Sequence, residues 1–216
     1  MVTSSAAREL VIAGCTALIL GTAALSPVEA GENPNFTIPM HAKPSMFESC
    51  DGYLPVDCLA VQPVVNVPQH TWIAIFVFVS NYNRLAYLQP GFQWPADWTW
   101  AFGLWDCQPG IGKIFGDAAT HIGGSYAFNQ CLEGPALTIL GRLFFQSGAS
   151  GCFRGWQPPY YQGFHAGDCS DVPDLIPDSD SPRIGRICVE SGGNSACEPA
   201  TPVAGATWGA IKASYR

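Results

Sequence analysis

Positive charge is scarce in this sequence and is nowhere clustered. The chain carries 10 Lys and Arg residues against 17 Asp and Glu, a formal net charge of −7 over 216 residues. Proteins that bind nucleic acid present a clustered basic footprint to the phosphates, and anionic membranes attract polybasic segments in the same way. The scattered basic residues therefore argue against nucleic acid and anionic membrane surfaces as partners.

Recognisable catalytic and metal-binding motifs are also missing. No Cys-x-x-Cys occurs, and no histidine lies three or four residues from another, so the usual spacing of zinc ligands is absent. Ser125 in HIGGSYA matches only part of a nucleophile elbow, because Ala127 stands where that motif has glycine. We therefore assign no catalytic residue and no cofactor from motifs.

Long helical periodicity, internal repeats and low-complexity segments are absent as well. Instead, 18 prolines and 23 glycines separate short apolar runs, a pattern typical of an all-β sandwich or barrel. We predict a disulfide-stabilised β-sandwich of Greek-key type with a short helical tail at the C-terminus. The expected strands cover 35–43, at a sheet edge because of Pro39, then 70–80, 84–89, 136–146 and 184–190. Residues 155–182 are expected to form a long loop with one short strand near 160–165.

The first 30 residues have the form of a secretory signal peptide. An apolar run, Leu10–Leu25, is too short for a comfortable membrane span, and the small residues Val28 and Ala30 predict cleavage before Gly31. A lipoprotein box ending at Cys15 is the less favoured alternative, because only five apolar residues precede that cysteine. The rest suits one sandwich domain over 31–197, a linker over 198–206 and a tail over 207–216.

Eight cysteines remain in the exported part of the chain. An even number in an exported protein indicates disulfides rather than reactive thiols. Cys50 with Cys58, and Cys107 with Cys131, are the expected pairs because the segments between them look like loops. Spacing leaves the other four open: Cys152, Cys169, Cys188 and Cys197.

Four of the seven tryptophans lie between Gln93 and Cys107. After Asp97, large apolar side chains alternate with small or polar ones, as in a strand that lines a core. The expected core stripe consists of Trp98, Trp100, Phe102 and Leu104. Trp94 and Trp105 fall off this stripe, so they are candidates for contact with an external ligand.

The stretch HTWIAIFVFVS (70–80) is apolar on both faces. An ordinary sandwich strand exposes one face to water, so this strand should be covered on both. The cover is either a loop or the C-terminal segment of the same chain, or else another chain, which makes self-association an alternative.

The best candidate for a recognition surface is the Pro-braced stretch GWQPPYYQGF. Its aromatic rings suit sugar rings or apolar groups of a protein partner: Trp156, Tyr160, Tyr161 and Phe164. A separate acidic run contains five aspartates between 168 and 180. Within it, Asp178 and Asp180 are a weak calcium candidate, because other ligands of a calcium loop are missing.

The C-terminal stretch TWGAIKASYR predicts a short helix with Trp208, Ile211 and Tyr215 on one side. So short a helix is stable only when it docks on its own domain or on a partner. Three stretches, NPNFTIPMHAK near the start of the domain, GLWDC in mid-chain and the ending PVAGATWGAIKASYR, resemble segments of a loose set of bacterial secreted proteins of uncharacterised activity. That resemblance implies a signal peptide and a cysteine-bridged, β-rich body, and suggests that the tail serves sorting or attachment.

These observations favour an exported, non-enzymatic binding or structural module at the cell surface or outside the cell. Two alternatives stay open. One is a secreted hydrolase acting on polysaccharide, whose carboxylates would converge only in the fold. The other is a subunit of a surface assembly, in which the two-faced apolar strand is buried between protomers.

Overall fold

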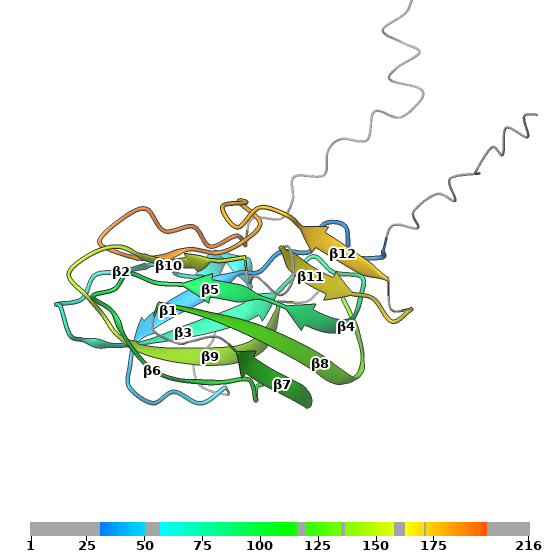
Figure 1. Ribbon diagram of the computed structural model, residues 1–216, viewed down its shortest axis with the longest axis horizontal. Helices are drawn as coiled ribbons and strands as arrows, with labels where there is room; N and C mark the ends of the chain where they lie inside the picture. The colour runs from blue at the N-terminus through cyan, green and yellow to red at the C-terminus, as the bar shows by residue number, and fades with distance from the viewer. Residues whose placement is uncertain are drawn as a thin grey trace, which may run out of the picture.

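Nearly all regular structure in the computed structural model is β-strand. The structure describes residues 31–50, 57–115, 120–134, 137–157, 163–170 and 172–197. In these residues the sole helix is a short 3-10 turn, η1 (Cys58–Ala60), and no helix there is long and apolar enough to span a membrane. Two sheets pack face to face as a β-sandwich (Figure 1), which confirms the predicted fold class. The predicted helical tail lies outside the described residues.

The smaller sheet has four antiparallel strands in the order β1-β3-β9-β6. These strands are β1 (Met40–Pro44), β3 (Trp72–Val79), β9 (Thr138–Gln146) and β6 (Thr99–Leu104). β1 lies at the edge, as Pro39 predicts, although the strand begins later than expected. The strongest sequence signal, 70–80, forms the central strand β3, because its β-branched and aromatic residues pack well on both sides.

The larger sheet follows the order β12-β11-β4-β8-β5-β10-β13-β2, and β7 pairs with the outer side of β8. Its members are β2 (Val64–Val65), β4 (Arg84–Gln89), β5 (Gly91–Gln93), β7 (Gly110–Phe115), β8 (His121–Glu133), β10 (Cys152–Gly155), β11 (Phe164–Gly167), β12 (Pro173–Ile176) and β13 (Ile187–Val189). The expected long loop at 155–182 thus contains the β11–β12 hairpin, gold in Figure 1. β8 was missed because glycines and polar residues blur its alternation.

Both faces of β3 are buried, as predicted. Ile73, Ile75 and Val77 face the core between the sheets. On the opposite face, Ala74, Phe76 and Phe78 join Phe144 of β9 in a second cluster, each at most 1% exposed. Burial of this second face is complete within one chain, so no partner chain is needed to cover it.

The segment that follows β1 lies against this second cluster. Phe47 stacks on Phe102, with ring centroids 6.4 Å apart, and Phe102 packs on Phe144 at 4.6 Å. Arg142 of β9 donates to the backbone carbonyl of Glu48. The cover therefore comes, at least in part, from a loop of the same chain.

The tryptophan stripe is interrupted by an irregularity in β6. Trp98 is buried and Trp100 packs against the main core, as expected. The register with β9 then shifts between Trp100 and Phe102, as in a β-bulge, which moves the following side chains to the other face. Phe102 and Leu104 are consequently 36% and 38% exposed, so their assignment to the main core was wrong.

All eight cysteines of the described residues form disulfides, but neither expected pair exists. The bonds join Cys50 to Cys107, Cys58 to Cys197, Cys131 to Cys169 and Cys152 to Cys188. Each bond connects distant parts of the chain, with sequence separations from 36 to 139 residues. Proximity in sequence misled the prediction because the tertiary fold, and not local loop closure, brings these cysteines together; only Cys152 and Cys188 lie opposite each other in paired strands.

Candidate functional site

The strands β5, β10 and β13 lie side by side and present polar residues on their outer face. Phe92 and Phe153 point into the core, at 0% exposure. Their neighbours Gln93 and Arg154 are paired across the two strands, and side chains alternate along a strand, so both lie on the outer face. The Cys152–Cys188 disulfide, between paired residues of β10 and β13, fixes this part of the sheet.

A pocket of about 340 Å³ opens on this surface. Its volume is near the lower end for small-molecule sites and suits one or two sugar rings or a short peptide segment. The lining residues are Gln93, Trp94, Pro95, Cys152, Arg154 and Arg186.

Two arginines supply the positive charge of the pocket. A carboxylate oxygen of Asp180 lies 3.5 Å from a guanidinium nitrogen of Arg154 and 3.7 Å from one of Arg186. With its amide oxygen facing Arg154, Gln93 accepts hydrogen bonds from two nitrogens of that guanidinium group, at 3.0 and 3.3 Å. Both arginine side chains are still 39–47% exposed. Two cations against one anion leave a net positive local charge.

One aromatic residue lines the pocket, and an aromatic pair lies elsewhere on the same face of the sheet. Trp94 is only 4% exposed and stacks on Trp100 with centroids 5.6 Å apart. Its indole N–H has no hydrogen-bond partner in the described structure, which is uncommon for a buried donor. Next along the outer face, Trp156 packs against His121 of β8 at 4.2 Å.

This arrangement suits recognition of an anionic group attached to a flat, hydroxyl-rich ligand. Guanidinium groups donate parallel hydrogen bonds to carboxylates, and these bonds are stronger than neutral ones. The amide of Gln93 and the carboxylate of Asp180 can exchange hydrogen bonds with hydroxyls. Aromatic rings beside such groups provide apolar contact area.

The predicted recognition residues are divided by the structure. Trp156 is half-buried, two residues after Arg154 on the same face of the sheet, whereas Tyr160 and Tyr161 lie outside the described residues. Phe164 is a core residue at 0% exposure, so its assignment as a ligand contact was wrong. It begins β11, and its side chain is directed between the sheets.

Trp94 and Trp105 are not the exposed rings that their position off the stripe suggested. Trp94 lines the pocket but is otherwise part of the core. Trp105 is half-buried, stacks on Phe92 at 6.4 Å and contacts Tyr126. A side chain at Gly141 would come within 2.9 Å of the Trp105 ring, so this glycine makes room for the indole. Trp105 therefore acts in packing.

The acidic run is not a single loop of solvated carboxylates. Asp168 and Asp174 are buried, and Asp171 lies outside the described residues. Asp178 accepts a hydrogen bond from the Asp180 backbone and so closes a turn. Because Asp180 pairs with two arginines, both carboxylates of the calcium candidate have other partners. A cluster with metal-ligand spacing, Cys50, Asp106 and Cys107, contains a disulfide, so its sulfurs are not available as thiolates.

Sequence reasoning missed Gln93, Arg154 and Arg186, which carry the polar character of the pocket. These residues are separated by up to 93 positions in the chain and meet only through the pairing of β5, β10 and β13. The one local signal for this face was the alternation of apolar Phe153 with polar Arg154 in a short stretch of sequence, which is typical of a strand with one exposed face.

No protein family model and no curated protein matches this chain. Among solved structures, it is similar to a cohesin module of the family 33 glycoside hydrolase of Clostridium perfringens, with 7% identity and a TM-score of 0.44, over 71% of this chain and 96% of that chain. It is also similar to a type II cohesin domain from the cellulosome of Acetivibrio cellulolyticus, with 10% identity and a TM-score of 0.41, over 59% of this chain and 90% of that chain. A non-cellulosomal cohesin from Archaeoglobus fulgidus is similar with 12% identity and a TM-score of 0.39, over 59% of this chain and 89% of that chain. Similarity at this level assigns neither family nor activity.

Proposed function

We propose that this protein is an exported, non-enzymatic binding module that recognises an acidic polysaccharide. The pocket between β5, β10 and β13 would receive the carboxylate of a uronic acid residue. The observation that carries this proposal is that Arg154 and Arg186, which both line the pocket, converge on one exposed carboxylate, that of Asp180.

The Asp180 carboxylate marks the position that a ligand carboxylate would take. It lies at 3.5 and 3.7 Å from the two guanidinium groups, longer than a well-formed charged hydrogen bond. Asp180 is on an exposed turn and its side chain is 59% exposed, so these surface pairs contribute little stability. A ligand carboxylate could displace Asp180 from the arginines at small cost.

Other features support export and binding. Four disulfides are typical of chains that fold in an oxidising compartment. The ring pair of Trp156 and His121 lies on the same face as Arg154, where a second sugar residue of a polymer would pass. The hydrolase alternative has less support, because the one carboxylate shown next to the described pocket lining, that of Asp180, is paired with both arginines, whereas glycoside hydrolysis usually needs two carboxylates.

Titration calorimetry with a trimer of galacturonic acid tests the proposal. The wild-type protein should bind it, and the neutral trimer of galactose should bind at least tenfold more weakly. Arg154→Ala and Arg186→Ala should each weaken binding about 10- to 100-fold, because a charge-assisted hydrogen bond contributes about 1.5–3 kcal/mol. Raising the salt concentration should weaken the binding of the acidic trimer to the wild-type protein, because salt screens the attraction between its carboxylates and the arginines.

Lys113→Ala provides the matched control, since Lys113 is an exposed cation on β7, away from the pocket lining. It should leave the affinity unchanged. Equal loss in all three variants would mean that net charge alone attracts the ligand. Binding of an acidic peptide in preference to the sugar acid would identify a protein partner and reject the carbohydrate.

A further inference from the structure

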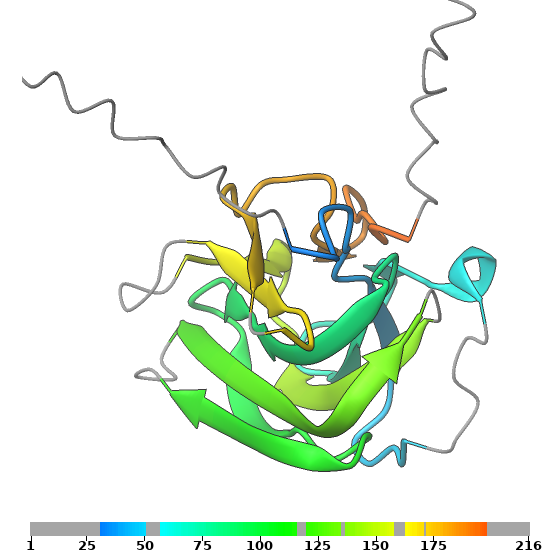
Figure 2. The same cartoon turned by 90° about the vertical axis from the view of Figure 1, so that its right-hand side faces the viewer.

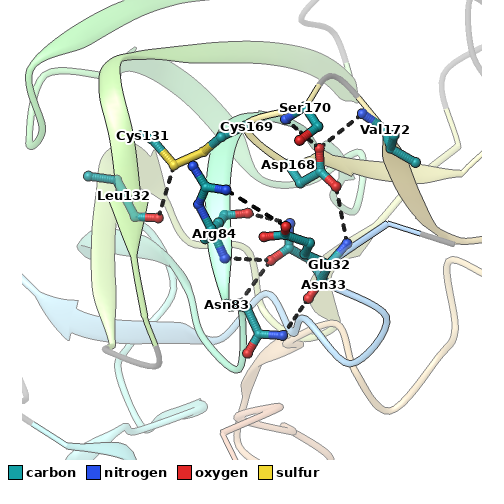
Figure 3. Close-up of polar contacts among 10 residues, drawn as sticks. All are labelled: Glu32, Asn33, Asn83, Arg84, Cys131, Leu132, Asp168, Cys169, Ser170 and Val172. Carbon is teal, nitrogen blue, oxygen red and sulfur yellow. Dashed lines mark hydrogen bonds and ion pairs between the residues drawn. A yellow bond between two sulfur atoms is a disulfide. The ribbon is translucent and has the colours of Figure 1, made fainter.

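The first described residues are held by two carboxylates that lie 136 and 141 positions further along the chain, in the β11–β12 region. The backbone N–H of Glu32 donates to Asp168 at 3.2 Å, and that of Asn33 donates to Asp174 at 2.5 Å. Figure 1 shows this start of the chain, in blue, beside β12. Figure 3 shows Asp168 directed at the backbone of Glu32.

The side chain of Asn33 fastens the same segment from the other side. Its oxygen accepts from the backbone of Asn83 at 2.9 Å and of Arg84 at 3.2 Å, and its nitrogen donates to the Arg84 carbonyl at 2.6 Å. The side-chain amide of Asn83 in turn donates a hydrogen bond to the backbone carbonyl of Glu32. Residues 31–33 therefore have one fixed position on the sandwich.

Both aspartates are buried, at 2% and 8% exposure. Within the described part of the chain, neither has a lysine or arginine nitrogen within 4 Å. Burial acts to raise the pKa of Asp168, but hydrogen bonds from the backbones of Val172, Ser170 and Glu32, with the charge of Arg84, lower it overall. Asp168 and Asp174 thus accept hydrogen bonds from adjacent backbone N–H groups at the start of the domain. The charges of Arg84 and Arg183 act on them only from beyond direct contact.

Gly31 is pressed against this acidic pair. A Cβ atom at this position would lie 2.4 Å from a carboxylate oxygen of Asp174 and 3.0 Å from the carbonyl of Val172. Only glycine fits this approach. Because N and Cβ of one residue are about 2.5 Å apart, the nitrogen of Gly31 lies within about 5 Å of that oxygen.

We propose that the Ala30–Gly31 peptide bond is hydrolysed, and that the α-ammonium group formed at Gly31 becomes the direct cation partner of Asp174. Water supplies the atoms, and a signal peptidase acting at the small residues Val28 and Ala30 is the class of enzyme required. The new carboxylate leaves with Ala30. The ammonium ion stays in the acidic site, so cleavage completes the fold as well as releasing the chain.

Intact mass and N-terminal sequencing of the exported protein are the first test. The expected chain begins at Gly31. A mature chain that begins at another residue, or retains residues before Gly31, would overturn the proposal.

Thermal unfolding then tests the ammonium pairing, with two chains of defined start, one at Gly31 and one at Val28. At pH 6.5 the Gly31 chain should have a Tm higher by about 2–4 °C. A carboxylate partner raises the pKa of an ammonium group, so under this proposal the advantage should be complete below the unfolded pKa of about 8 and should disappear as pH rises through the folded value.

Asp174→Asn should abolish the difference between the two starts, whereas Glu190→Gln, at an exposed position, should preserve it. Gly31→Ala leaves a residue that signal peptidase accepts but adds the clashing Cβ, and should lower the Tm of the correctly cleaved chain. Equal Tm values for the two starts across pH 6–10 would contradict the role given to the ammonium group.

Discussion

Individual buried polar residues give this sandwich its specific connections. Asn33 is 1% exposed and makes three hydrogen bonds to backbone atoms through its side chain. His41 is also buried, on β1, and its Nδ1 accepts from the backbone of Gln62 at 3.0 Å. Such residues are invisible to a hydrophobic pattern, because the same side chains are common in exposed turns.

Protonation of His41 should destabilise the fold at mildly acid pH. Burial, with a smaller contribution from the charge of Lys43, lowers the pKa of His41 below its ordinary value of 6.5. Stability is therefore complete above 6.5 and is lost as pH falls towards the folded pKa. Urea unfolding at pH 7 and pH 5 should show a loss in the wild type that is smaller in His41→Gln, where an amide oxygen can still accept from Gln62.

The exposed His70 supplies the control for that measurement. Its backbone φ is 65°, a region that asparagine tolerates better than most residues, so His70→Asn should fold normally. Because this change removes a histidine but leaves His41 in place, the variant should retain the wild-type pH dependence. If His41→Gln also retains it in full, His41 is not the group responsible.

At the scale of elements, the strongest periodic stretches were predictable and the irregular ones were not. Strand β4 has the predicted bounds of 84–89, and β3 and β9 fall within the predicted ranges. The bulge in β6 was not predictable, because one extra residue leaves the letters alternating while the side chains change faces. The β11–β12 hairpin was hidden by prolines and aspartates that are more typical of turns.

The Cys50–Cys107 disulfide holds the loop after β1 over the outer apolar cluster. Replacing both cysteines by alanine should lower the free energy of unfolding by about 2–4 kcal/mol, since the bond closes a segment of 57 residues. The outer cluster around Phe144 should become more accessible, detected as increased binding of a hydrophobic dye.

Replacing Cys152 and Cys188, which join neighbouring strands on the polar face, should cost a similar free energy without an increase in dye binding. Equal dye binding in both double variants would show that the loop is not held specifically by the first bond.

At the scale of the whole molecule, composition predicted the class of fold better than the location of the site. Punctuated apolar runs, and an even number of cysteines after residue 30, were sufficient to predict a disulfide-stabilised sandwich. The pocket was not predictable, because Gln93 and Arg186 become neighbours of Arg154 only through long-range strand pairing. Aromatic content was a poor guide to the site, because Phe164 and Trp105 pack in the core between the two layers of the sandwich. Figure 2 shows these layers from the side.

The most direct measurement of the central claim is the indole N–H spectrum of ¹⁵N-labelled protein during titration with trigalacturonate. Seven tryptophans are present, and assignment by single Trp→Phe variants identifies each signal. The signals of Trp94 and Trp156 should shift with one common dissociation constant. The signal of Trp98, whose indole already donates to the carbonyl of Ser150 at 3.0 Å, should stay in place. No shift of Trp94 and Trp156 at saturating ligand, or shifts confined to other tryptophans, would contradict a binding site in this pocket.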